Sequence, residues 1–155
     1  KEPPSNVITT TVSKFSPEGK RLWSSYIHAG EHLFSNGKEL FITSSLINGN
    51  SRNDQLITTA NAYQRKHGGE KLDVYTFILS LDGKTLEYAS FYGYDGRDSG
   101  TALPTENGFY IIGASDLNKK AKAPFVTSNA PENEYFENGN YYVGDFLSYF
   151  KRNKK

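Results

Sequence analysis

The chain of 155 residues contains no cysteine, no methionine and only one tryptophan. Without cysteine it can form no disulfide bond, thiolate metal site or lipidated thiol. No apolar run approaches the roughly 20 residues of a membrane-spanning helix, and no signal peptide is recognisable. Because methionine is missing even at position 1, we expect a processed product or a piece of a longer chain. A formal net charge of +1 argues against a nucleic acid or an acidic membrane as the main partner.

Aromatic residues and glycine are abundant instead. The chain has 11 tyrosines, 10 phenylalanines and 14 glycines, and β-branched and aromatic residues alternate with Gly, Asn and Asp. This composition favours short strands joined by tight turns. No stretch combines a helical apolar period with helix caps. The sequence therefore predicts an all-β fold.

The order of strands and turns can be predicted along the first half of the chain. Residues 1–6 are polar and proline-rich, and we interpret them as a linker. Turns are expected at Ser16–Gly19 and at Asn36-Gly37, and a loop over Ile47–Asp54. The predicted strands are Val7–Phe15, Arg21–Ile27, Glu31–Ser35 and Glu39–Ser44.

The stretch Asp73–Ser115 repeats this plan. Gly19 corresponds to Gly83 and Trp23 to Tyr88, while 40–42 corresponds to 109–111. A self-similar unit of roughly 60–70 residues with four short strands predicts a β-propeller-like architecture. We expect about two four-stranded blades, at 7–70 and 71–140, each with its connecting loop. The segment 141–155 would then hold the first strand of a further blade, Tyr141–Phe150, and a basic tail, so the propeller would be incomplete.

An incomplete propeller needs neighbours. One blade has two apolar faces and cannot bury both alone, and closed propellers typically have about 4–8 blades. We expect further blades from the same polypeptide, or a partner protein that contributes them by blade stacking or strand addition. The candidate edges for strand addition are Val7–Phe15 and Tyr141–Phe150. The chain alone should associate or expose apolar blade faces.

Two segments resemble the bacterial β-propeller repeat family labelled SBBP. They are Ser13–Tyr26 and Leu79–Gly93, and the later parts of the repeat are similar to 58–64, 93–100 and 109–115. The variant is similar to copies in large secreted proteins of Bacteroidetes-type bacteria, and the likeness extends over about 12–150. It implies a propeller fold and a secreted, cell-surface or outer-membrane location. The family supplies no catalytic motif to carry over.

His28-Ala29-Gly30-Glu31-His32 matches the H-x-x-E-H pattern of inverted zinc peptidases. That chemistry needs both histidines on one face of a helix, so that they reach one zinc ion. Here Gly30 interrupts the segment and predicted strands flank it. We therefore interpret the match as coincidence and predict no metal site.

The loop at 93–100 is the richest polar stretch, and we take it as the first candidate for ligand binding. The candidate ligand-binding residues are Tyr92, Tyr94, Asp95, Arg97 and Asp98. Calcium is conceivable because hard cations take oxygen ligands from such turns. With only two local carboxylates and no D-x-D-x-D-G pattern, self-capping of the turn is the favoured interpretation, and no cofactor is predicted.

A hydrolase remains the alternative of a different class. A glycosidase would need two carboxylates about 5–9 Å apart, and the pool is Asp73, Asp82, Asp95, Asp98 and Glu106. Asp82 is already explained by its turn with Gly83, and no G-x-S-x-G or phosphate-binding loop is present. His67, before Gly68-Gly69, is expected at the surface. An enzyme should gather ionisable groups in one cleft, whereas a scaffold should scatter its carboxylates at turns.

The aromatic residues at repeat-equivalent strand positions are expected to fill the space between blades. They are Trp23, Tyr26, Tyr88, Phe91, Phe109 and Tyr110. The overall prediction is a non-enzymatic binding or scaffold segment of a secreted or surface β-propeller protein, whose loops contact protein or glycan. The alternatives are part of a secreted glycan-active hydrolase or lyase, and an accessory subunit that completes its sheet with a partner chain.

Overall fold

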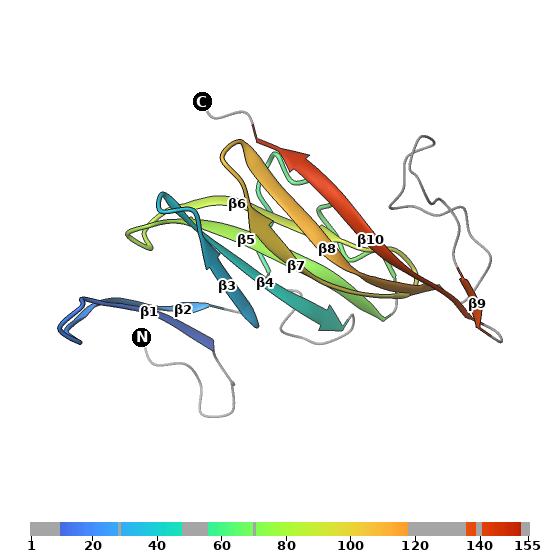
Figure 1. Ribbon diagram of the computed structural model, residues 1–155, viewed down its shortest axis with the longest axis horizontal. Helices are drawn as coiled ribbons and strands as arrows, with labels where there is room; N and C mark the ends of the chain where they lie inside the picture. Colours follow the sequence, from blue (N-terminus) through green and yellow to red (C-terminus); the bar gives the residue numbers. More distant parts are fainter. Residues whose placement is uncertain are drawn as a thin grey trace.

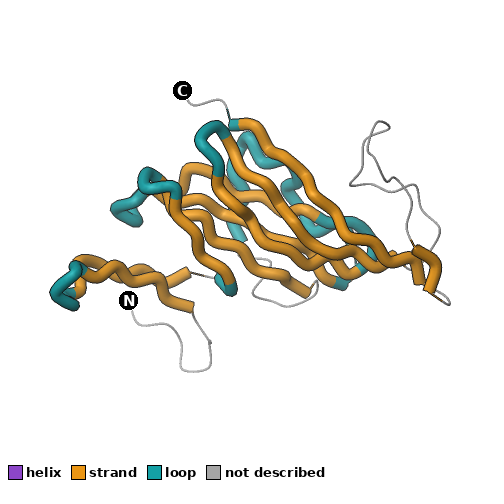
Figure 2. The backbone as a smooth tube through the Cα atoms, in the orientation of Figure 1, coloured by secondary structure: helices purple, strands orange, loops and turns teal. Residues whose placement is uncertain are grey.

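The computed structural model describes residues 10–27, 29–47, 56–69, 71–117, 136–138 and 141–152. Every regular element in these ranges is a β-strand, which confirms the predicted all-β class. The same ranges contain no helix long and apolar enough to cross a membrane. Strands and short turns account for most of the described backbone (Figure 2).

The described residues form ten strands, and their tight turns use the expected glycines. Gly19, Gly37 and Gly83 have positive φ angles of 81°, 80° and 72°, which suit glycine because it lacks a Cβ. The strands are β1 (Thr10–Phe15), β2 (Arg21–Ile27), β3 (His32–Ser35), β4 (Glu39–Ile47), β5 (Leu72–Ser80), β6 (Leu86–Tyr92), β7 (Arg97–Pro104), β8 (Gly108–Leu117), β9 (Phe136–Asn138) and β10 (Tyr141–Lys151).

Backbone pairing arranges these strands in three groups. β1 and β2 form a separate antiparallel hairpin. β3, β4, β5 and β6 form an antiparallel sheet in chain order, and β7, β8 and β10 form another, with β9 beside the start of β10. One parallel pair, Leu72 with Arg97, connects these two antiparallel parts, so that β3 to β10 form one continuous eight-stranded hydrogen-bonded sheet. In Figure 1 the hairpin lies at one end, β3 to β6 in the middle, and β7, β8 and β10 beyond them.

Hydrogen bonding crosses the boundary at residue 70 between the two expected units. β4 pairs with β5 at nine positions, from Glu39–Ser80 to Ile47–Leu72. The sheet β3–β6 therefore combines the second hairpin of the first repeat with the first hairpin of the second. β8 and β10 repeat this pairing. The sequence repeat and the hydrogen-bonded sheet are offset by one hairpin, because a strand in an antiparallel meander pairs with both chain neighbours.

Two hydrophobic cores lie on opposite faces of the middle sheet. Alternate residues of a strand point to opposite faces, so Leu40 and Ile42 pack toward the hairpin residues Val12 and Ile27, in the first core. Phe41 packs toward the sheet β7–β8–β10, in the second core. The second core also contains Val74, Ile78, Tyr88, Tyr92, Ala102, Phe109, Ile111 and Phe146. The molecule is thus a stack of hairpin, sheet and sheet.

The first core is less completely filled. A cavity of about 240 Å³ separates the hairpin from β5 and β6, with Tyr26, Ile57 and Phe77 among its lining residues. The prediction that repeat-equivalent aromatics fill the spaces between layers holds for Tyr88, Phe91 and Phe109, which are buried. It is wrong for Tyr26 and Tyr110, which are 63% and 39% exposed.

The repeat is preserved in local backbone geometry. A register shift interrupts the β1–β2 pairing between Lys14 and Phe15, and the same irregularity occurs in β5–β6 between Ile78 and Leu79. Trp23 lies opposite Lys14, as Tyr88 lies opposite Ile78. The two hairpins are therefore equivalent in pairing register as well as in sequence.

Candidate functional site

The five predicted ligand residues separate into two groups in the structure. Tyr92 ends β6 and is buried in the second core, and Asp98 is fully buried at the start of β7. Tyr94 and Arg97 are exposed, and Asp95 is half-buried. The loop expected over 93–100 is shorter than predicted, because β7 already begins at Arg97. Only Tyr94, Asp95 and Arg97 offer side-chain atoms to solvent in this loop.

Asp98 fastens the loop that precedes it. Its Oδ2 accepts a hydrogen bond from the backbone N–H of Tyr94 at 2.6 Å, and its Oδ1 is buried with no hydrogen-bond partner among the described residues. Burial, reinforced by the negative charges of Asp73 and Asp116, raises the pKa of this carboxyl from 3.8 to about 6. The hydroxyl of Ser115, opposite Asp98 in the β7–β8 ladder, acts in the reverse direction without offsetting these effects.

Asp73 likewise holds a neighbouring loop in place by accepting hydrogen bonds from it. Its Oδ2 accepts hydrogen bonds from the N–H of Gly68 at 2.6 Å and from Nε2 of Gln64 at 3.0 Å. Burial raises the pKa of Asp73, while these hydrogen bonds and nearby His67 lower it in part. A Cβ added at Gly93 would lie 2.3 Å from the Asp73 carboxyl carbon. Only glycine at position 93 therefore leaves room for this buried carboxylate.

Gln64 and His67 tie the two loops together. Gln64 Oε1 accepts the N–H of Gly93 at 3.0 Å. The His67 nitrogens lie 2.9 Å from the carbonyl oxygen of Gly69 and 2.8 Å from that of Leu46. The expectation that His67 lies at the surface is wrong, because its side chain is only 8% exposed. Its imidazole lies within hydrogen-bond distance of the backbone of Gly69 and Leu46, which is a structural role.

The two buried carboxylates have raised pKa values, as catalytic acids often do. Their hydrogen bonds, however, go to loop N–H groups and to an amide side chain, and neither residue lines the hollow described below. Asp82 caps its own turn, where Oδ1 accepts the N–H of Lys84 at 3.1 Å. Asp73, Asp82 and Asp98, three of the five carboxylates in the predicted hydrolase pool, thus hold turns and loops.

The chain has two candidate places for metal binding, the loop at 93–100 and the H-x-x-E-H match at 28–32. Within the described ranges no group of three or more His, Asp or Glu side chains is arranged to hold a metal ion. Of the H-x-x-E-H match, His28 lies outside the described residues. Glu31 and His32 sit at the beginning of strand β3, and Glu31 Oε2 accepts the N–H of Ser45 at 3.2 Å. Glu31 and His32 therefore do not lie on the helix that this zinc motif requires.

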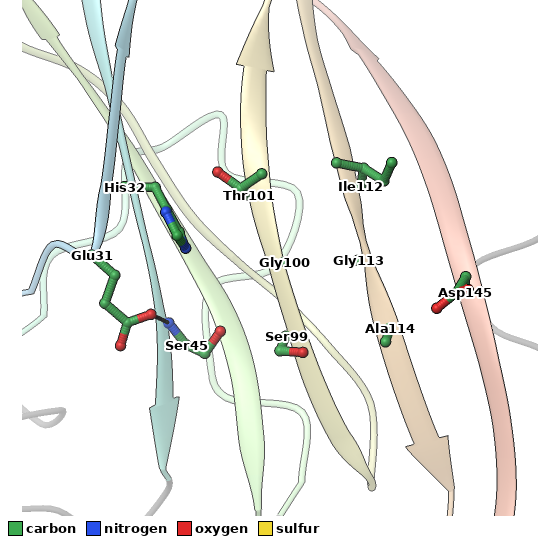
Figure 3. A pocket seen from close by; sticks show the side chains of 10 residues that line it. All are labelled: Glu31, His32, Ser45, Ser99, Gly100, Thr101, Ile112, Gly113, Ala114 and Asp145. Carbon is green, nitrogen blue, oxygen red and sulfur yellow. Dashed lines mark hydrogen bonds between the residues drawn. The ribbon is translucent and has the colours of Figure 1, made fainter.

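An open hollow of about 590 Å³ lies where β3 and β4 meet the sheet β7–β8–β10. Glu31, His32 and Ser45 form one side of it and Asp145 the other, while Ser99, Thr101 and Ile112 lie between them (Figure 3). Gly100 and Gly113 expose backbone at its floor. The hollow offers two carboxylates, an imidazole and hydroxyl groups, which suit hydrogen bonding to a polar ligand such as a glycan.

The outward surface of β7, β8 and β10, which shares Thr101 and Ile112 with the hollow, is largely apolar. We call it the open face, and it comprises Thr101, Leu103, Tyr110, Ile112, Leu147 and Tyr149. The rings of Tyr110 and Tyr149 lie 4.9 Å apart between centroids. The exposed fractions are 39% for Tyr110, 47% for Ile112, 63% for Leu147 and 48% for Tyr149. Clustered apolar exposure of this kind marks an interaction surface.

The predicted loop was therefore not the main surface feature, and sequence reasoning missed the hollow and the open face. The one sequence signal for the open face was the alternation along β10, where Leu147 and Tyr149 occupy the face opposite to Phe146. The hollow draws on β3, β4, β7, β8 and β10, and no local motif unites them. Comparisons of this chain with family models, curated proteins and solved structures found no match.

Proposed function

We propose that this chain is a non-enzymatic scaffold segment of the β-propeller kind. In this role successive sheets stack as blades, and the exposed loops and the hollow contact protein or glycan. The observation that carries the proposal is that the open face matches, position for position in the strand register, a face that is buried inside the same molecule.

The correspondence follows from the pairing register. Phe41 lies opposite Ile78 in the β4–β5 ladder, and Tyr110 lies opposite Tyr149 in the β8–β10 ladder. Thr43 and Thr76 in the middle sheet likewise correspond to Ile112 and Leu147. The four residues of the middle sheet are at most 1% exposed, because β7, β8 and β10 cover them.

A covering layer is accordingly expected on the open face as well. The internal example shows its chemistry: Ala102, Phe109, Ile111 and Phe146 present small, aliphatic and aromatic side chains at alternating positions of an antiparallel sheet. A further blade of the same repeat has this pattern. The resemblance of the sequence to secreted bacterial propeller repeats supports the same proposal, together with a secreted or cell-surface location.

One observation favours a second function, a hydrolase or lyase acting on glycans. Burial raises the pKa values of Asp73 and Asp98, and the two charges influence each other. Such a pair is typical of acid–base catalysis. We prefer the scaffold because both carboxylates hold loop N–H groups.

The scaffold proposal is tested with the full chain and a panel of soluble polysaccharides. Affinity electrophoresis measures retardation, and reducing-end release is measured in the same samples. We expect no release of reducing ends, whether or not a polysaccharide retards the chain. Release that disappears in Asp73→Asn or Asp98→Asn would overturn the non-enzymatic assignment.

The open face is tested with an apolar dye such as bis-ANS. We expect dye fluorescence from the wild-type chain and a large loss in the double variant Ile112→Asp/Leu147→Asp. Leu22→Asp, an equally drastic change of a residue 53% exposed on β2, is the matched control. Undiminished fluorescence in the double variant would show that this face is not the apolar surface.

A further inference from the structure

Among the described residues, a strand pairs with the outer edge of β10 only at its beginning. On one side β10 pairs with β8 from Tyr142 to Lys151. On the other side β9 pairs only with residues 141–143, and no other described strand continues along that edge. The repeat-equivalent edge of β5 is occupied by β6 from Val74 to Leu79. An edge of this kind is able to pair with another chain.

The backbone of β10 determines which residues present hydrogen-bonding groups at this edge. The N–H of Arg152 donates to the carbonyl oxygen of Asn107, in line with the β8 ladder. Backbone groups alternate in direction along a strand. The even-numbered residues of 144–152 therefore bond toward β8, and Asp145, Leu147, Tyr149 and Lys151 direct their N–H and C=O groups outward.

The side chains of the same four residues form a self-complementary series. All four lie on the open-face side of β10 and are exposed, in the order acidic, apolar, aromatic, basic. A two-fold axis through Ser148 would place a second β10 antiparallel to the first. Asp145 would then lie opposite Lys151 of the second copy, and Leu147 opposite Tyr149.

We propose that β10 is a homodimerisation strand, and that two copies of this chain pair their β10 edges antiparallel about Ser148. The sheet β7–β8–β10 would then continue into its symmetry mate as one six-stranded sheet. This deepens the proposed function by naming the partner of the sheet edge, while the scaffold role itself does not depend on it.

The proposed register satisfies two independent conditions. Directly opposed residues in it are 145 with 151 and 147 with 149, so outward-directed backbone groups meet each other and can form the ladder. It also places Asp145 of each copy opposite Lys151 of the other, so the two-fold axis creates two pairs of opposite charge. Opposed residues of opposite charge stabilise an antiparallel pair, and like charges destabilise it. An axis at Leu147 or Tyr149 keeps the backbone bonds but loses the pairing of Asp145 with Lys151.

The first test measures association of the full chain by sedimentation equilibrium from about 5 µM to about 500 µM. We expect a reversible monomer–dimer equilibrium. Asp145→Lys and Lys151→Asp each place two like-charged pairs in the interface and should raise the dissociation constant about tenfold or more. The double variant Asp145→Lys/Lys151→Asp restores both pairs in exchanged positions and should recover the wild-type constant.

The second test exploits the absence of cysteine in the natural chain. In the proposed register Ser148 opposes itself at a position without inter-strand hydrogen bonds, where Cα atoms approach to about 4.5 Å. That spacing is within the range of a disulfide. Ser148→Cys should therefore cross-link to a covalent dimer on treatment with diamide. Ser99→Cys, an exposed position on β7 of the same sheet, is the matched control and should remain monomeric.

The outcomes separate the alternatives. A monomer at all concentrations, without cross-linking of Ser148→Cys, would overturn the proposal and leave the edge to another strand, either from the same polypeptide or from another protein. A dimer insensitive to both charge reversals would also overturn it, by showing that another surface associates. Neither result changes what is expected for dye binding by the open face or for reducing-end release. The proposed function is therefore tested independently of the dimer.

Discussion

Replacing Asp98 by asparagine converts a buried carboxylate into a neutral side chain of nearly the same size. Asparagine keeps an oxygen that can accept the N–H of Tyr94. Its new NH₂ group lies near the Ser115 hydroxyl, which can accept a hydrogen bond. The change therefore removes the buried charge and retains the bond that holds the loop.

The expected magnitude follows from the pKa. In the folded chain the pKa of Asp98 is about 6, compared with 3.8 in its ordinary state. At 1.36 kcal/mol for each pKa unit, keeping Asp98 ionised in the fold costs about 3 kcal/mol at neutral pH. Asp98→Asn should raise the free energy of unfolding at pH 7 by up to about this amount.

The pH dependence has a definite sign. A raised folded pKa means that the native state binds the proton more tightly than the unfolded chain. The contribution of Asp98 to stability is complete below its unfolded pKa of 3.8 and is lost as pH rises through about 6. The wild-type chain should therefore lose stability between about pH 4 and pH 7, and Asp98→Asn should lose less.

Urea unfolding at several pH values provides the assay, with fluorescence of Trp23, the single tryptophan, as the probe. The matched control is Asp82→Asn. Asp82 is exposed, and its pKa is lowered by the hydrogen bond from Ser80, so its contribution has the opposite sign and is lost as pH falls. If Asp98→Asn were less stable than wild type at pH 7, the carboxylate would have to be favourably ionised, and the reasoning would fail.

Three further variants test the packing between strands and layers. Gly113→Ala would place a Cβ 2.0 Å from the carbonyl oxygen of Ser99, so we expect thermal unfolding to show a loss of several kcal/mol. Phe109→Ala removes a ring from the centre of the second core and should cost about 3–5 kcal/mol, whereas the exposed neighbour Tyr110→Ala should cost under about 1 kcal/mol; equal losses in urea titrations would contradict the layer assignment. Thr43→Val removes the hydroxyl that accepts a buried N–H of β7 at 3.1 Å, and an unfolding loss of about 1–3 kcal/mol is expected.

Local chemistry was sufficient to predict the strands and turns. Glycines 19, 37 and 83 are followed or preceded by residues that favour tight turns, and the structure gives all three a positive φ. Alternating apolar residues indicated the strands, and Arg21–Ile27 has the predicted bounds. Both features depend on residues close together in sequence, which is why they can be recognised without knowledge of tertiary contacts.

The pairing of strands and the burial of polar groups depend on distant residues and were harder to predict. Nothing in Glu39–Ile47 shows that its second neighbour is Leu72–Ser80, which lies beyond a long connection. Asp98 and His67 follow or precede glycines and resemble loop residues in sequence. Their burial results from Gly68, Gly69 and Gly93, which allow two loops to approach within contact distance of each other.

The hollow and the open face were the features hardest to predict from the sequence. Ile112 and Leu147 alternate like buried strand residues, and only the position of their sheet at the end of the stack exposes them. The hollow joins Glu31 to Asp145, which are more than a hundred residues apart in sequence. Sequence comparison within the chain identified the equivalent positions, but the layer order was needed to show which copy is covered.

The β1–β2 hairpin has a consequence for the dynamics of the chain. Its two strands pair only with each other, so side-chain packing holds them to the middle sheet, and a cavity of about 240 Å³ interrupts that packing. The hairpin can therefore swing away without breaking a backbone ladder. Such an opening would uncover Leu40, Ile42 and Phe77, and should be the lowest-energy excursion from the native state. In hydrogen exchange, amides of β1 and β2 should lose protection well before those of β4 and β5, and aggregation on storage should begin from this partly opened form.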